Sequence, residues 1–175
     1  GPAFLEEIRG QFVLHLKGTP YEMGLQHGRL FRQETAEDMT AYVDDFALKS
    51  GNTMESLMTM WKQAEPHVPQ KFKDELRGLA EGAQLPLERV IAAHILPEKY
   101  HCSGYATWGK GTRDGKLYHY RSLDYGCHIG EKKRIQENAC LILREPTGGV
   151  ASAVVGWAGT IGCVSGMNAA VGPYT

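Results

Sequence analysis

The sequence predicts an α+β fold, in which a mainly helical segment (1–101) precedes a segment of antiparallel strands (102–175). Three observations support this. Of the 21 Gly, 8 precede Cys102 and 13 follow it. Apolar residues recur with a helical period in the first segment and a strand-like period in the second. Asp114-Gly115, a typical hairpin turn, separates two strand-like runs. No internal repeat or low-complexity linker is evident, so we expect no second domain.

The first segment is expected to hold one short strand, 12–16, and then helices. Thr19 can cap the first helix, Pro20 suits its first position, and Glu22 can complete a capping box. The apolar stripe of this helix is Met39, Tyr42, Val43, Phe46 and Ala47, and Ser50-Gly51 ends it. Further helices are expected from Asn52, with Glu55 as its partner, to about 65–66, over 69–83, and from Pro86 to Pro97.

The second segment is expected to hold five strands. Two of them, 102–108 and 116–124, form the hairpin around Asp114-Gly115, and the others are 139–143, 150–155 and 163–165. Apolar and polar residues alternate poorly in the third and fourth strands. This pattern indicates burial on both faces, as in a layered sandwich.

Composition excludes several function classes. Hydrophobic residues make up 42% of the chain, and 19 Lys and Arg balance 20 Asp and Glu. The densest basic run, 132–134, has no interleaved aromatic residue, so we expect neither nucleic acid nor an anionic membrane as a partner. No stretch approaches the roughly 20 apolar residues of a membrane span. No signal peptide is evident, and Gly1-Pro2 has the form of a tag-cleavage remnant, so secreted, periplasmic and cytoplasmic locations stay open.

The four cysteines, at 102, 127, 140 and 163, form no CxxC pair and no zinc-ligand spacing. Cys102 stands out because it begins the first strand of the hairpin, while Arg121 and Asp124 end the second. A hairpin brings its two ends together, so a thiol and charged partners can meet there. For Asp124 to face Cys102, the hairpin needs an odd-length loop or a bulge, for which Gly109 and Gly111 are natural places. A regular strand would put Arg121 and Asp124 on opposite faces, so one of them must sit at a bend.

At these residues the sequence resembles the cysteine-type N-terminal-nucleophile (Ntn) hydrolases, and within them the isopenicillin-N acyltransferase-like autoproteolytic acyltransferases and hydrolases. Bile salt hydrolases and acid ceramidases are more distant. The segments that carry the resemblance are 102–106 (Cys-Ser-Gly-Tyr-Ala), 114–115 (Asp-Gly), 121–124 (Arg-Ser-Leu-Asp), 18–24, 26–28, 79–83 and 166–168. They cover nearly the whole chain, and the combination of Cys with Arg-x-x-Asp is the most specific part.

The resemblance implies an αββα sandwich and a two-stage role for Cys102. Its thiol would first attack the carbonyl of His101 and break the chain there. The freed α-amine, with a reference pKa of about 7.7–8.0, could then serve as base for the same thiol. Arg121 would stabilise the thiolate and Asp124 would hold the amine. The substrate would be a small N-acyl amide, hydrolysed or transferred through a thioester, with no metal or organic cofactor.

The chain also departs from the family. The hairpin is about three residues longer than in bile salt hydrolases, around 108–111, and family members carry an oxyanion-hole Asn and a second Arg downstream of Thr175. We therefore expect the β sheet to be incomplete here and the chain to be a fragment. Its own C-terminal remainder, or a second copy, is an expected partner.

Each singled-out residue also has a structural interpretation. Cys102 could be a buried thiol, and Arg121 with Asp124 a surface ion pair contributing about 0–1 kcal/mol. His101 is interpreted as the residue left at the new C-terminus. Asn168 could occupy a turn or help an oxyanion. Tyr105 and Trp108, like Trp157, could be core or could stack on a substrate, and His27 is interpreted as a packing or capping histidine. Two competing functions stay open: a non-catalytic structural or ligand-binding relative of the same fold, and a Cys-His protease without self-cleavage.

Overall fold

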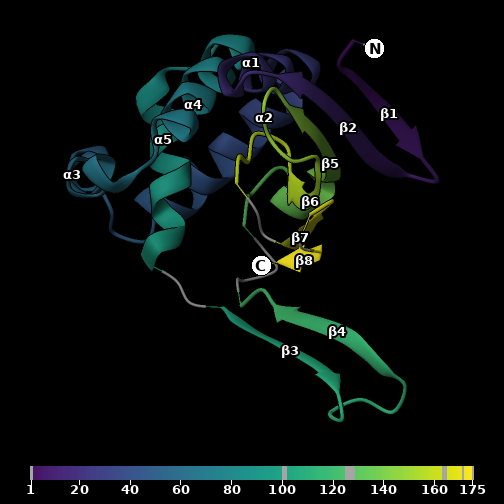
Figure 1. Cartoon of the computed structure of the whole chain (residues 1–175). Helices are drawn as coiled ribbons and strands as arrows, with labels where there is room; N and C mark the ends of the chain where they lie inside the picture. The colour runs from purple at the N-terminus through teal and green to yellow at the C-terminus, as the bar shows by residue number, and fades with distance from the viewer. Residues whose placement is uncertain (1, 100–101, 125–128, 163–164, 171, 175) are drawn as a thin grey trace.

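The computed structural model describes residues 2–99, 102–124, 129–162, 165–170 and 172–174. A six-stranded sheet carries helices on one face, and a separate two-stranded hairpin stands apart from this body (Figure 1). Helices and mostly antiparallel strands together confirm the α+β prediction. One sheet includes strands from both predicted segments, because β2 (Gln11–Gly18) pairs in parallel with β5 (Ala139–Pro146).

The first helix begins as the sequence predicts but is much shorter than expected. In α1 (Pro20–Leu30) the Thr19 side chain accepts from the Glu22 amide and Glu22 completes the capping box. Phe31 then takes non-helical backbone angles, φ −116° and ψ 37°, and interrupts the helix. The chain continues as α2 (Arg32–Met39) and a π-helix, Thr40–Leu48. The expected single α-helix to residue 50 is therefore wrong, although its apolar stripe does reach the core.

The later helices lie close to their expected places. They are α3 (Met54–Ala64), α4 (Gln70–Ala83) and α5 (Leu87–Ile95), with short 3-10 turns at Glu65–His67 and Leu96–Lys99. The cap of α3 is Thr53 with Ser56, and not Asn52 with Glu55. Since Thr53 is also a good N-cap residue, composition alone could not choose between adjacent candidates. Gln84 ends α4 in the left-handed region, at φ 59°.

Four glycines let α1 and α4 touch backbone to backbone. A Cβ added to Gly24 would lie 2.1 Å from the carbonyl oxygen of Glu75, and one added to Gly78 would lie 2.1 Å from that of Tyr21. Gly28 and Gly82 are similarly crowded, at 2.5 Å and 2.3 Å. These distances are far below van der Waals contact, so no side chain fits at this crossing. The glycines thus hold α1 directly against α4.

The sheet order is β1-β2-β5-β6-β7-β8, and every pairing except β2–β5 is antiparallel. The remaining strands are β1 (Phe4–Ile8), β6 (Ser152–Trp157), β7 (Ser165–Asn168) and β8 (Gly172–Tyr174). The sequence prediction missed β1 and β8 and placed the fifth strand at 163–165, where 163 and 164 lie outside the described residues. Otherwise the predicted strands correspond to real ones, shifted by a few residues.

In the described part of the chain, the helices lie on one face of the sheet (Figure 1). Cys140, Ile142 and Val154 are buried in one core cluster with Met23 of α1 and with Phe31. On the other face Leu141, Val155 and Met167 are 36%, 52% and 55% exposed. We call this second surface the open face. The expected burial of the third and fourth strands on both faces is thus not met, because the helices pack against one side only.

The hairpin consists of β3 (Ser103–Gly109) and β4 (Gly115–Ser122). Ser103 pairs with Ser122, and the register shifts between Thr107 and Gly109, where Gly109 pairs with Gly115. An irregularity next to Gly109 and an odd-length loop, here 110–114, are both present, but the extra residue lies on β4 and the register still sets Cys102 opposite Leu123 instead of Asp124. The Asp114-Gly115 pair lies at the end of this loop, and Gly115, at φ 73°, uses the left-handed region that suits glycine.

Candidate functional site

Cys102 lies exposed directly before β3, at the open end of the hairpin. The interpretation as a buried structural thiol is therefore wrong for this residue. The exposed thiol is accessible to a reagent or a substrate.

Arg121 shares a face of the hairpin with Cys102. It pairs with Gly104 across the two strands, and Cys102 is two positions before Gly104. Side chains two apart in a strand point to the same side, and such diagonal positions lie about 7–8 Å apart, within reach of a long side chain. Arg121 is half-buried, and extension of the register places Leu123, which is 36% exposed, on the same face opposite Cys102. The register of the hairpin therefore places Arg121 and Cys102 at diagonal positions on the same face.

Asp124 is not on that face. Extending the register places Cys102 opposite Leu123, so Asp124 lies one position further and, by alternation, on the other side. β4 ends at Ser122, whose hydroxyl donates to an Asp124 carboxylate oxygen at 2.6 Å. Asp124 therefore lies beyond the last residue of β4, and the bend expected at Arg121 or Asp124 stays a prediction. A role of Asp124 in holding the Cys102 amine requires the segment after Ser122 to turn toward Cys102.

Tyr105 and Trp108 are 62% and 65% exposed, so the interpretation of these two as core residues is wrong. Tyr105 packs beside Tyr120 on the opposite strand, with ring centroids 5.3 Å apart. Trp157, in contrast, is a core residue that stacks on Tyr42 at 5.9 Å. The hairpin therefore presents aromatic side chains to its surroundings, where a substrate or another part of the protein could cover them.

Asn168 ends β7, and its side-chain oxygen accepts from the Ala170 amide at 3.0 Å. This contact is the turn role that the sequence suggested, although Asn168 is not among the described residues with positive φ. His101, with the expected cleavage bond, and the thiols Cys127 and Cys163 lie outside the described residues. No contact among the described residues places Asn168 next to Cys102.

Two histidines, the buried His27 and the partly buried His94, hold the loop between β6 and β7, and the sequence did not single them out as site residues. The Nε2 atom of His27 accepts from the Gly159 amide at 2.9 Å, and that of His94 accepts from the Ile161 amide at 3.0 Å. Both rings must be neutral to accept. Burial lowers the pKa of His27 to about 3, helped by the positive charge of Arg144, and burial also lowers the pKa of His94. Both side chains therefore fix the loop by accepting hydrogen bonds from its backbone. For His27 this contact adds a specific partner to the packing or capping role expected from the sequence.

A second buried polar contact joins α2 to the 3-10 turn Ile135–Asn138, which directly precedes β5. The Asn138 side-chain amide donates to an Asp38 carboxylate oxygen at 2.7 Å, and Asp38 and Asn138 are 1% and 0% exposed. Burial raises the pKa of Asp38 to about 8. Burial, with the nearby Asp38 charge, also raises the pKa of the Cys140 thiol to about 12. Cys140 is thus a poor nucleophile, in contrast to the exposed Cys102.

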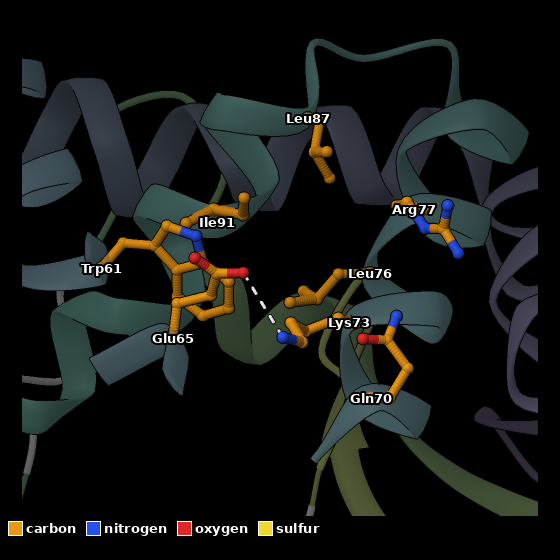
Figure 2. Close-up of a pocket in the computed structure, with 8 residues that line it drawn as sticks. All are labelled: Trp61, Glu65, Gln70, Lys73, Leu76, Arg77, Leu87 and Ile91. Carbon is orange, nitrogen blue, oxygen red and sulfur yellow. Dashed lines mark hydrogen bonds and ion pairs between the residues drawn. The ribbon is translucent and has the colours of Figure 1, made fainter. Parts of the chain in front are cut away.

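A hollow of about 250 Å³ lies among α3, α4 and α5, and Figure 2 shows its lining. Trp61, Leu76 and Ile91 supply apolar surface, and Lys73 donates to Glu65 at 3.3 Å across it. None of the site residues expected from the sequence lines this hollow.

Within the described ranges, His, Cys, Asp and Glu side chains form no cluster of three or more suited to a metal ion. No helix in the described part of the chain has the length and apolar character needed to cross a membrane.

No family model matches the chain. The chain is similar to Protein dcd1B of Dictyostelium discoideum, with 26% identity over 186 residues that cover 91% of this chain and 36% of the relative. Protein dcd1A of the same organism is 26% identical over 91% of this chain and 43% of its own length. An uncharacterised protein of Archaeoglobus fulgidus is 26% identical over 92% of this chain and 32% of its own length. The chain thus spans about a third to two-fifths of the length of these relatives, whose names state no activity.

Proposed function

We propose that this chain belongs to a self-processing cysteine Ntn amidohydrolase or acyltransferase that acts on N-acyl amides. One observation carries the proposal: the exposed Cys102 lies at the open end of the hairpin, with Arg121 on the same face of the partner strand. A guanidinium on that face can stabilise the negative charge that develops while sulfur attacks an amide carbonyl. The motif resemblance of 102–106 and 121–124 supplies the reaction class.

The proposed fold of the whole protein is an αββα sandwich. The open face exposes Leu141, Val155 and Met167, and apolar side chains in such a row are typical of a surface that another layer covers. The β3–β4 hairpin would be the first part of that second layer, because its aromatic side chains are also uncovered and it already stands away from the first sheet (Figure 1). The C-terminal remainder of a longer protein, or a second copy, would supply the rest.

Self-processing would proceed in two steps, transfer of the acyl group to sulfur and then hydrolysis. The Cys102 sulfur attacks the carbonyl carbon of His101, the bond to the Cys102 nitrogen breaks, and that nitrogen takes up the thiol proton. Water then cleaves the resulting thioester, leaving a carboxylate on His101 and a free thiol and amine on Cys102. In turnover, this amine accepts the thiol proton while sulfur attacks the substrate amide carbonyl. The leaving amine departs protonated, and water or another amine takes the acyl group from the thioester.

The experiment that tests this proposal compares variants in an amide-cleavage assay. The substrates are acyl 4-nitroanilides of several chain lengths, in which cleavage of the bond between acyl group and nitrogen releases 4-nitroaniline, and they are offered to the longest natural form of the protein. Cys102→Ala should lower kcat/KM by about a thousandfold or more, as expected for removal of a nucleophile. Arg121→Lys should lower it by about tenfold or more because the planar guanidinium is lost.

Arg113→Lys is the matched control, since Arg113 is exposed in the hairpin loop, and it should leave the activity unchanged. Activity that survives Cys102→Ala but disappears with a metal chelator would overturn the proposal. A complete absence of activity toward acyl amides, with Cys102 unreactive, would favour the non-catalytic alternative.

A further inference from the structure

A larger hollow of about 570 Å³ lies between the helices and the sheet, among α1, α4, β5 and β6. We call it the α4–β5 pocket. Its volume is typical of pockets that hold small molecules. Met23, Phe72 and Val154 give it apolar walls, and Val150 stands 49% exposed at its rim. Cys102 does not line this pocket, so a ligand here would not depend on the proposed chemistry.

A charged pair forms the polar part of the lining. The Arg144 guanidinium donates to both Glu75 carboxylate oxygens, each at 2.7 Å, and the Glu75 side chain is only 2% exposed. These two bonds use one N–H of each terminal nitrogen, whereas a guanidinium carries five N–H donors. Arg144 also lines the pocket. The two hydrogen bonds to Glu75 therefore fix the orientation of the Arg144 guanidinium. Its remaining N–H groups can donate to a second acceptor.

The charge balance of the lining favours an anion. Lys71 and Arg144 are cations, and Glu75, the one carboxylate among the described residues that line the pocket, already has both oxygens engaged by Arg144. The positive charge of Arg144 still acts on its surroundings, because it helps to lower the pKa of His27. A carboxylate suits the planar donor group of arginine, and apolar walls disfavour a more highly charged phosphate.

We infer that the α4–β5 pocket binds a small organic acid, whose carboxylate meets the free edge of the Arg144 guanidinium while its apolar body lies along Met23, Phe72 and Val154. Lys71 adds attraction at the mouth. The hollow of Figure 2 is less suited to this ligand. It is smaller, and its cations Lys73 and Arg77 already pair with Glu65 and Asp74.

Isothermal titration of the 175-residue chain with octanoate tests the inference, with octanamide as the probe that has the same body but no charge. Octanoate should bind and octanamide should bind at least about tenfold more weakly, because the amide cannot make the charged contact. Val150→Trp should abolish octanoate binding, since the indole would fill the rim of the pocket. Lys71→Met should weaken binding about threefold to tenfold, the size expected for one exposed charge.

Lys62→Met is the matched control on α3, where Lys62 is exposed and does not line the pocket, and it should bind octanoate like the parent chain. Neither Lys71 nor Val150 is in the core, so these variants should fold, as circular dichroism can check. Equal binding of octanoate and octanamide, unchanged binding in Val150→Trp, or no octanoate binding by the folded parent chain would each overturn the inference. None of these results depends on amide cleavage.

Discussion

At the scale of single residues, the two described thiols differ in burial. Cys102 is exposed, whereas Cys140 is 4% exposed and burial raises its pKa to about 12. We predict that iodoacetamide at neutral pH labels Cys102 first, which peptide mapping by mass spectrometry would show. Cys102→Ala should remove the fast phase. Faster labelling of Cys127, Cys140 or Cys163 would contradict the prediction.

The buried Asp38 makes stability depend on pH. Its folded pKa of about 8 lies above the reference value of 3.8, so between these values the folded state holds a proton that the unfolded state has lost. Stability therefore falls as pH rises from about 4 through 8. The groups around it are Asn138, Glu37, Glu34, Lys133 and Cys140. On the acid side, the lowered pKa of His27 has the opposite effect, and stability falls as pH drops below about 6.5.

Asp38→Asn should accordingly flatten the alkaline fall in stability and leave the acid fall in place. The amide removes the titrating proton while it can still accept from Asn138. Urea unfolding measured from pH 5 to about 9 checks this, with Asp114→Asn at an exposed hairpin position as control. An alkaline limb that stays as steep in Asp38→Asn as in the parent chain would show that another group titrates.

At the scale of elements, the glycines between α1 and α4 carry the sharpest prediction. Gly78→Ala should destabilise the chain by about 2–4 kcal/mol, because its Cβ would lie 2.1 Å from a backbone oxygen that cannot rotate away. Thr59→Ala, at an exposed position of α3, should change the free energy of unfolding by less than about 0.5 kcal/mol. Chemical denaturation gives both values, and similar effects of the two changes would contradict the close packing.

Local signals explain which elements the sequence could predict. The capping box of Thr19 and Glu22 depends on residues three apart, and the helical period of α4 is visible within its own 14 residues. The parallel pairing of β2 with β5 depends on contacts between residues more than 100 positions apart. No local pattern encodes them. The break at Phe31 and the following π-helix were missed for the same reason, since the apolar spacing there also fits an α-helix.

In the candidate site, too, the contacts between residues close in sequence could be predicted, and those between distant residues could not. Cys102 and Arg121 could be found from a motif and from hairpin geometry, because they lie near each other in sequence. The contact between Asp38 and Asn138 joins residues 100 positions apart. A lone Asp in a helix and a lone Asn before a strand carry no signal of that meeting. The face on which Asp124 lies could not be fixed either, since it depends on where β4 ends.

At the scale of the whole molecule, the described structure differs from the proposed αββα sandwich in its open face, which a second layer would cover. Val155→Lys should leave the stability of the 175-residue chain within about 0.5 kcal/mol, since Val155 is 52% exposed here. In a longer form whose second layer covers this face, the same change should cost more than about 2 kcal/mol because a charge is buried. Lys62→Met, on an exposed surface of α3, is the control in both forms. Equal effects of Val155→Lys in the two forms would contradict the sandwich.

The proposed self-processing is tested most directly by the mass of the longest natural form of the protein under denaturing conditions. We expect two polypeptides whose boundary lies between His101 and Cys102, with the mass of one water added in total. Cys102→Ala should remain a single chain, and Cys102→Ser should split slowly because a hydroxyl is a weaker nucleophile than a thiolate. A folded parent protein that stays one chain while it cleaves acyl amides, or a Cys102→Ala variant that splits at the same bond, would contradict the account.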